Sequence, residues 1–140
     1  MKRWIFESGN ELRQDVNAVF SIFQMQNIDP TAVFATISNP VRLRCLFLVA
    51  TNLDVCVCEV EEALQIAQPA ASKALNALKA QGIVTATRDA NWNYYSLNDS
   101  MPDWLREIVN STVKELSGRQ PYRKDATRLR NLELRPMACD

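Results

Sequence analysis

The spacing of apolar residues changes at Gly82 from a helical period to a period of two, and that change limits the possible folds more than any other feature. Before Gly82, apolar residues recur at the three- and four-residue steps of amphipathic helices. After it, residues 83–88 and 92–97 alternate in the two-residue period of β-strands. A helical stripe then returns over residues 105–116. This order predicts a mostly α-helical fold with one small β-hairpin.

Helix-start signals divide the first half of the chain into separate helices. Asp29-Pro30 and Asn39-Pro40 each place a capping side chain before a proline, which suits the first helical position. The second signal opens the apolar run 41–50, in which Arg42 and Arg44 are expected to face solvent. Both helices should therefore begin at their prolines.

The remaining helices are predicted from their apolar stripes and their ends. Residues 12–23 have the spacing of an amphipathic helix, and residues 59–66 that of a short one. A longer helix over residues 69–81 is closed by Gly82, which suits a left-handed residue after a helix. Ser100 to Asp103 has the form of a capping box for the last helix.

The side-chain inventory narrows the functional class. The 140 residues include four cysteines and no histidine, so imidazole acid–base catalysis and imidazole zinc sites are excluded. No nucleophile–base set, phosphate loop or cofactor fingerprint is present, so we expect no enzyme and no required cofactor. The apolar run 4–6 is too short for a signal segment or a membrane span, which predicts a cytoplasmic protein with no membrane partner.

Two of the cysteines, Cys56 and Cys58, are separated by one residue. They are too close in sequence to form a comfortable disulfide with each other. In an extended segment their side chains share a face, whereas on a helix they point about 200° apart. They lie where a loop enters a short helix, so either arrangement is open. Soft thiolates bind soft, thiophilic ions, which makes the pair a candidate sensor site.

A polar face on the helix over residues 69–81 predicts contact with nucleic acid. Ser72, Lys73, Asn76 and Lys79 lie on one side, and Gln68 lies at the start of the helix. Gln68 and Ser72 are placed to reach base edges or phosphates, and the two lysines to hold phosphates.

Two wing residues extend the predicted DNA contacts. Arg88 and Asn91 belong to the hairpin that follows, where they are placed to contact the adjacent DNA backbone or minor groove. For the aromatic residues Trp92, Tyr94 and Tyr95, packing against the core is favoured over a stacking platform.

Several motifs in this order resemble the ArsR/SmtB repressors, within them the arsenite-responsive branch. The segment Asn39-Pro40-Val41-Arg42-Leu43-Arg44 is similar to the family's DPTRLRIL opening, and Cys56-Val57-Cys58-Glu59-Val60 to its arsenic box. The recognition helix of the family resembles Gln68-Pro69-x-x-Ser72-Lys73, and its wing resembles Trp92-x-x-Tyr95-x-Leu97. The resemblance covers residues 31–118 and implies a homodimeric winged helix-turn-helix.

The chain also departs from the family pattern. Glu61 stands where arsenic-box proteins often have a third cysteine, and residues 103–118 lack the histidine of the family's zinc site. Ala74 replaces the usual histidine of the recognition helix, and Ala90 the usual glycine of the wing turn. A regulatory zinc site on the last helix is therefore excluded.

The resemblance implies a repressor that binds operator DNA when ligand-free and is released by arsenite or antimonite bound at Cys56 and Cys58. Trivalent arsenic prefers three sulfurs, so Cys139 is a candidate third ligand, with a terminal thiol of no function as the alternative. A thiol redox or persulfide sensor on the same fold, in which Cys56 pairs with Cys139 or a partner cysteine, is the rival hypothesis. Cys45 is expected in the core.

The chain is expected to have three parts. Residues 1–30 form an N-terminal extension with a dimerisation helix, and residues 31–118 form the winged helix-turn-helix domain. Residues 119–140 are rich in arginine and are expected to form a flexible tail. The resemblance implies that the dimer pairs through its first and last helices.

Overall fold

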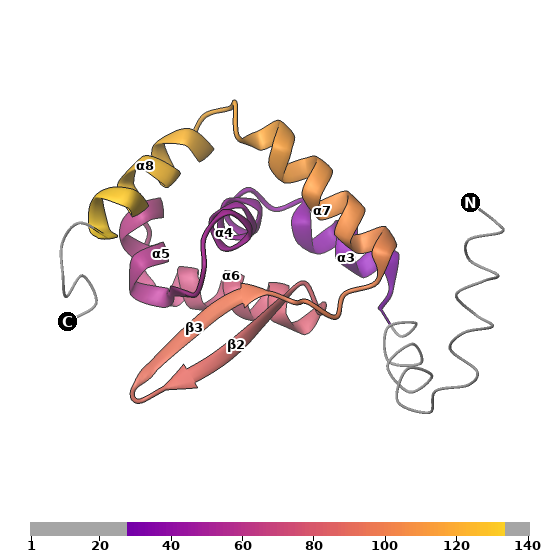
Figure 1. Cartoon of the computed structure of the whole chain (residues 1–140), viewed down its shortest axis with the longest axis horizontal. Helices are drawn as coiled ribbons and strands as arrows, with labels where there is room; N and C mark the ends of the chain where they lie inside the picture. Colours follow the sequence, from indigo (N-terminus) through magenta and orange to yellow (C-terminus); the bar gives the residue numbers. More distant parts are fainter. Residues whose placement is uncertain (1–27, 134–140) are drawn as a thin grey trace, which may run out of the picture.

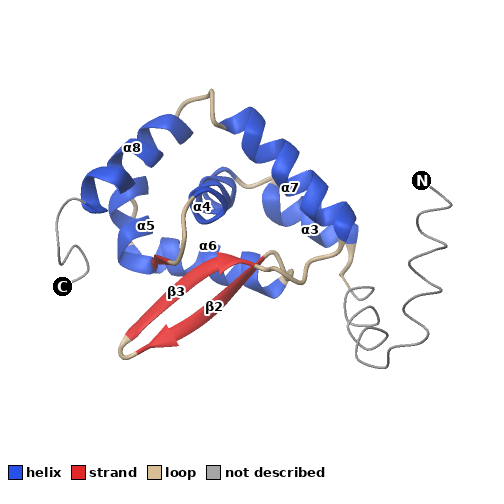
Figure 2. Cartoon of the chain, in the orientation of Figure 1, coloured by secondary structure: helices blue, strands red, loops and turns tan. Residues whose placement is uncertain are grey.

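The computed structural model describes residues 28–133. The predicted helix over residues 12–23, and with it most of the expected N-terminal extension, lies outside the described residues. The elements are α3 (Pro30–Ile37), α4 (Pro40–Thr51), β1 (Val55–Cys56), α5 (Val57–Leu64), α6 (Gln68–Ala80), β2 (Val84–Asp89), β3 (Trp92–Leu97), α7 (Asp103–Leu116) and α8 (Tyr122–Glu133). Figure 2 colours the helices blue and the strands red.

Helix α4 occupies the centre of the fold, and the other helices surround it (Figure 1). Five consecutive residues of α4, from Cys45 to Val49, are buried, so this helix presents apolar side chains on all sides. A helix that is apolar all round is stable only when its neighbours cover it. Helices α6, α7 and α8 and strand β3 all contact α4. The fold is confirmed as mostly helical, with the helix-turn-helix formed by α5 and α6 and the wing by β2 and β3.

The two predicted helix starts are confirmed. The Asp29 carboxylate accepts a hydrogen bond from the backbone N–H of Thr31, and Pro30 is the first residue of α3. The side-chain oxygen of Asn39 accepts from the backbone N–H groups of Val41 and Arg42. These caps satisfy donors that have no partner within the helix.

The sheet has three strands in the order β1–β3–β2, all antiparallel. The wing is the predicted hairpin, and its turn contains Ala90 with a φ of 55°. Gly82, which ends α6, has a φ of +72°, and a Cβ there would also lie 3.2 Å from Ile28 Cδ1. The backbone conformation therefore favours glycine at position 82, and a side chain there would also require the tip of Ile28 to shift by a few tenths of an ångström. The pairing of β1 with β3 was not expected from the sequence.

Two helix starts differ from the prediction. Helix α5 begins at Val57, two residues earlier than expected, because the carboxylate of Glu59 accepts a hydrogen bond from the backbone N–H of Cys56 and closes its first turn. Helix α7 begins at Asp103 with Pro102 as its N-cap and no side-chain capping bond. The proposed capping box from Ser100 is therefore wrong.

The expectation of a flexible tail after residue 118 is wrong for Tyr122–Glu133, which form helix α8. This helix lies beside α5 in Figure 1, and Leu129 and Asp125 are fully or almost fully buried. The tail was predicted to be mobile because of its many charges. One of those charges, on Asp125, is paired inside the protein with Arg44, so the expectation that Arg44 faces solvent is also wrong.

Over residues 28–133, no single helix is both long and apolar enough to span a membrane. Helices α3 and α4 satisfy that criterion only as a pair, and they are bent by 98° from each other.

Candidate nucleic-acid interface and thiol site

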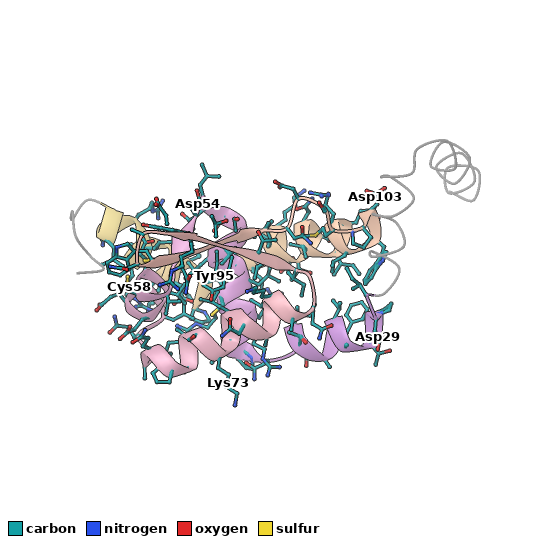
Figure 3. All side chains as sticks on the ribbon, turned by 90° about the horizontal axis from the view of Figure 1, so that it is seen from below. Asp29, Asp54, Cys58, Lys73, Tyr95 and Asp103 are labelled. Atoms are coloured by element: carbon teal, nitrogen blue, oxygen red, sulfur yellow. The ribbon has the colours of Figure 1, made fainter. Side chains whose placement is uncertain are left out.

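The outer face of α6 carries the predicted DNA-contact residues. Gln68, Lys73, Asn76 and Lys79 are exposed and Ser72 is half-buried. Figure 3 shows Lys73 projecting away from the ribbon of α6. The opposite face of the helix is buried in the core and consists of Ala71, Ala74, Leu75 and Leu78. Burial of one face fixes the orientation of the other, so α6 presents a fixed set of polar side chains to solvent.

The residue at position 74, where the family usually has a histidine, lies on the buried face of α6. Its side chain is buried among the residues that face the core, so it does not belong to the outer face of α6. The polar residues at the neighbouring positions remain on the outside. The departure from the family pattern at this position therefore leaves the outer face of α6 intact.

The wing adds two further exposed residues, Arg88 in strand β2 and Asn91 in the turn between β2 and β3. The Arg88 Nε donates to the Ala90 carbonyl at 3.4 Å, which folds the arginine back over the turn. The wing is also linked to α6, because the hydroxyl of Tyr95 donates to Asn76 Oδ1 at 3.4 Å. The predicted contact residues of α6 and of the wing thus belong to two elements held together by a polar contact.

The aromatic residues of the wing have different environments. Tyr95 is buried, and its burial raises the pKa of the phenol. Tyr94 is half-buried and Trp92 is exposed at the tip of the hairpin. Packing against the core therefore describes Tyr95, whereas Trp92 remains accessible.

The sulfur atoms of Cys56 and Cys58 lie 2.9 Å apart. Cys56 precedes α5 in an extended conformation, with φ −90° and ψ 161°, and Cys58 is the second residue of the helix. This change of backbone conformation between the two residues brings their side chains together. Of the two arrangements left open by the sequence, the structure has the one in which the two side chains converge.

Cys56 is at the same time part of the sheet. It is opposite Tyr94 in the register of β1 and β3, and the preceding Val55 is opposite Tyr95. The thiol site therefore borders the wing on one side and α5 on the other. Among the residues from 28 to 133, no group of three or more Cys, His, Asp or Glu side chains could hold a metal ion.

The other two cysteines have different positions. Cys45 is fully buried in α4, as expected, and burial raises the pKa of its thiol to about 12. Cys139 lies outside the described residues. Of the three cysteines predicted to bind a ligand, the structure brings together Cys56 and Cys58.

Asp125 on α8 forms a charged cluster that the sequence did not predict. Its carboxylate is fully buried and receives two hydrogen bonds of 2.8 Å from Arg44 and one of 3.0 Å from Arg128. The hydrogen bond with Asp125 raises the pKa of Arg44. We name these three residues the Asp125 cluster. The only local signal for it was the three-residue spacing of Asp125 and Arg128, since Arg44 is far away in sequence.

The sequence is similar to those of known transcriptional regulators. Residues 39–86 match the family described as bacterial regulatory protein, arsR family. The arsenic resistance transcriptional regulator ArsR2 of Pseudomonas putida is 36% identical over 110 residues, which are 79% of this chain and 94% of that protein.

Solved structures share the fold at lower sequence identity. The homodimeric winged helix-turn-helix DNA-binding domain Mb0332 of Mycobacterium bovis, titled a possible ArsR-family regulator, has a TM-score of 0.52 and 22% identity, and the match covers 76% of this chain and 89% of that one. The antimony-specific transcriptional repressor AntR has a TM-score of 0.52 and 20% identity, with 66% and 86% covered.

Proposed function

The chain belongs to the ArsR family of transcriptional repressors, and from this premise we propose that it binds operator DNA when ligand-free and is released by trivalent arsenic or antimony at Cys56 and Cys58. The observation that carries the proposal is the 2.9 Å separation of the two sulfur atoms at the start of α5. Helix α5 leads into α6 through only three residues. The thiol pair is therefore close in the chain to the helix proposed to contact DNA.

The ligand class follows from the chemistry of the donors. Two thiolates select a soft, thiophilic ion over hard cations, which prefer oxygen. Trivalent arsenic and antimony bind three sulfurs in a pyramid, so the pair supplies two of the three. We propose Cys139, from the same subunit or its partner, as the third. The relatives named for arsenic resistance support arsenite as the inducer, and the antimony-specific repressor supports antimonite.

DNA recognition is assigned to α6 and the wing. In a helix-turn-helix the second helix enters the major groove and its first residues meet base edges. We assign this role to Gln68 and Ser72, with Asn76 following one turn later. Lys73 and Lys79 bind phosphates, which position the protein without reading sequence. On the wing, Arg88 and Asn91 contact the adjacent backbone or minor groove.

A homodimer would present two copies of α6 to a pseudo-palindromic operator. Helix α7 retains apolar side chains that this subunit covers only in part, among them Trp104, Ile108 and Val113. We propose that they pair with a second copy, together with the predicted N-terminal helix. The homodimeric Mycobacterium bovis domain supports this assembly.

A second candidate function is a thiol redox switch, and the same sulfur separation favours it. Two thiols in contact can be oxidised by a peroxide to a disulfide, with the peroxide reduced to water and the two thiol protons ending in the water formed. The redox hypothesis drawn from the sequence pairs Cys56 with Cys139 or a partner cysteine, whereas this candidate pairs it with Cys58. Both candidates use the same pair but require different inducers.

The experiment that separates these functions measures operator binding by fluorescence anisotropy, with a labelled duplex selected from random sequence by the protein itself. Arsenite, antimonite and hydrogen peroxide are titrated against the complex. Cys56→Ser and Cys58→Ser should bind the duplex as wild type does but no longer release it with arsenite. Cys45→Ala, which removes a buried thiol outside the site, is the control and should still respond.

Other results of the operator-release experiment would change the proposed function. A Cys56→Ser/Cys58→Ser double variant that is still released by arsenite would exclude the pair as the inducer site. Wild type that ignores arsenite and antimonite but responds to peroxide through the same two cysteines would replace the metalloid function by the redox one. Loss of the response in Cys139→Ser would support the third ligand.

A further inference from the structure

We propose that α8 is a clamp on the carboxyl end of α5, that Asp125 is its positioning residue, and that this clamp determines how strongly inducer binding changes operator affinity. The last part rests on the function proposed above, because it assumes that α5 carries the inducer site and leads into the DNA-contact helix. The first part is a property of the fold and is tested separately.

The clamp begins with the Asp125 cluster. The carboxylate of Asp125 is 0% exposed and pairs through both oxygens with the Nε and Nη2 atoms of Arg44. Arg128, one turn later in α8, donates to the same carboxylate at 3.0 Å. A two-point pairing of this kind fixes direction as well as distance. Helices α4 and α8 are thereby held in one relative position.

Both arginines continue from the carboxylate to α5. The Nη2 of Arg44 donates to the carbonyl of Leu64 at 3.1 Å, and the Nε of Arg128 donates to the carbonyl of Ala63 at 2.6 Å. These carbonyls belong to the last turn of α5, where a helix has no internal donors left to offer. Cationic donors at this end are also favoured by the helix dipole. The last turn of α5 is therefore closed by side chains from two other helices.

Apolar packing holds α8 in place independently of the charges. Leu129 is almost fully buried, and the ring of Tyr122 meets that of Phe47 edge to face, with centroids 5.6 Å apart. Changing one charge in the cluster should therefore loosen the last turn of α5 and leave α8 docked. The effect of the charge cluster on α5 can therefore be tested by mutation without undocking α8.

The position of the clamp explains its proposed effect. Helix α5 has the sulfur pair at its amino end and the clamp at its carboxyl end. After the clamp come the left-handed residue Gln65 and then α6. Coupling between two sites requires an element with discrete arrangements that both sites bias. If the last turn of α5 frays, a change at the sulfur pair is lost before it reaches α6. An intact clamp transmits it.

The test compares Asp125→Asn with Glu115→Gln. Both substitutions neutralise a carboxylate that is paired with arginine, but the side chains of Glu115 and Arg119 are exposed and their ion pair lies outside the Asp125 cluster. For each variant, operator dissociation constants are measured with and without arsenite, and amide exchange is followed at Ile66, Ala70 and Ala71. Their N–H groups are bonded in the turn between α5 and α6 and in the first turn of α6.

We expect Asp125→Asn to accelerate exchange of these amides by tenfold or more and to reduce the arsenite-induced change in operator affinity at least threefold. Glu115→Gln should match wild type in both measurements. A role in stability alone would lower the melting temperature and leave the affinity ratio at its wild-type value, which would overturn the regulatory part. Unchanged amide exchange would overturn the clamp itself.

A substitute variant and a second reading of the data allow the test to decide in two further cases. If Asp125→Asn does not fold, Arg128→Gln replaces it, because that change keeps the Arg44–Asp125 pair and removes the bond to Ala63. If wild-type protein is not released by arsenite, the proposed function fails, and amide exchange alone then decides whether α8 clamps α5.

Discussion

Arg44 and Asp125 are joined by two hydrogen bonds of 2.8 Å although 81 positions separate them in the chain. This pair attaches the C-terminal helix to the central one. Because the Asp125 carboxylate is fully buried, its loss leaves Arg44 and Arg128 without their counter-charge. The side chain of Arg44 is only 19% exposed, so water can replace the lost hydrogen bonds to its charge only in part.

We therefore predict that Asp125→Asn lowers the free energy of unfolding by about 3 kcal/mol, near the lower end of the values for a broken buried ion pair. Urea unfolding monitored by circular dichroism measures the change. Glu115→Gln, whose carboxylate is 66% exposed, should change stability by no more than about 0.5 kcal/mol. Equal losses in the two variants would contradict the structural role of Asp125.

Lys73→Ala should weaken operator binding for every DNA sequence to a similar extent. Loss of one phosphate contact lowers the slope of log affinity against log salt by about one unit, so a symmetric dimer should lose about two. Lys114→Ala removes an exposed lysine of α7 and serves as the control. If both variants have the wild-type affinity and salt slope, Lys73 does not contact DNA.

Arsenite and operator should oppose each other by the same factor. Coupling between two sites is reciprocal and typically amounts to about 1–3 kcal/mol, or roughly 5- to 150-fold in affinity. Arsenite affinity measured by calorimetry should therefore fall in the presence of saturating operator DNA by the factor with which arsenite weakens operator binding. A difference between the two factors would mean that arsenite acts at more than one site.

The thiol of Cys45 should remain protonated in the native protein up to a high pH. Its pKa is raised from 9.0 to about 12 by burial, so the native state keeps the proton when the unfolded state releases it. The stability this provides is complete below pH 9 and is lost as the pH rises from 9 towards 12, by about 1.4 kcal/mol for each pH unit. Urea unfolding between pH 9 and 11 should show this loss for wild type and a smaller one for Cys45→Ala. Equal losses would contradict the raised pKa.

The left-handed conformation of Ala90 predicts that glycine stabilises the wing. A residue with a Cβ in this conformation is strained by about 1–2 kcal/mol, and glycine recovers most of this at some cost in chain entropy. We expect Ala90→Gly to raise the free energy of unfolding by about 0.5 kcal/mol. Ala86→Gly, within strand β2, should lower it. Destabilisation by Ala90→Gly would show that the turn does not hold its φ of 55° in solution.

The sequence predicted those parts of the fold that are set by neighbouring residues. Asp29 and Asn39 start their helices by capping groups two or three positions away, and Gly82 ends α6 through its own φ angle. The exposed face of α6 also follows from local spacing. These features could be recognised because cause and effect lie within one or two helical turns.

Features that depend on distant pairing could not be recognised. Helix α8 has a narrow apolar stripe and many charges, so its composition resembles that of a mobile tail. It packs against residues of α4 that are distant in sequence, Phe47 and Arg44, and the pattern of α4 placed Arg44 in solvent. Strand β1 has two residues, too few for a period, and exists because it pairs with β3. The convergence of Cys56 and Cys58 depends on the change of backbone angle between them.

The short turn between α5 and α6 gives α6, the helix that we propose contacts DNA, the properties of a lever. Helix α6 has 13 residues and is therefore about 20 Å long. A tilt of about 5° at its amino end displaces the far end by about 1.7 Å, which exceeds the range of distances over which a hydrogen bond survives. Lys79, near the far end, would lose its phosphate while Gln68, at the pivot, hardly moves. A small displacement at the pivot would thus be amplified into loss of the DNA contact, with the core around Leu78 repacking as α6 tilts.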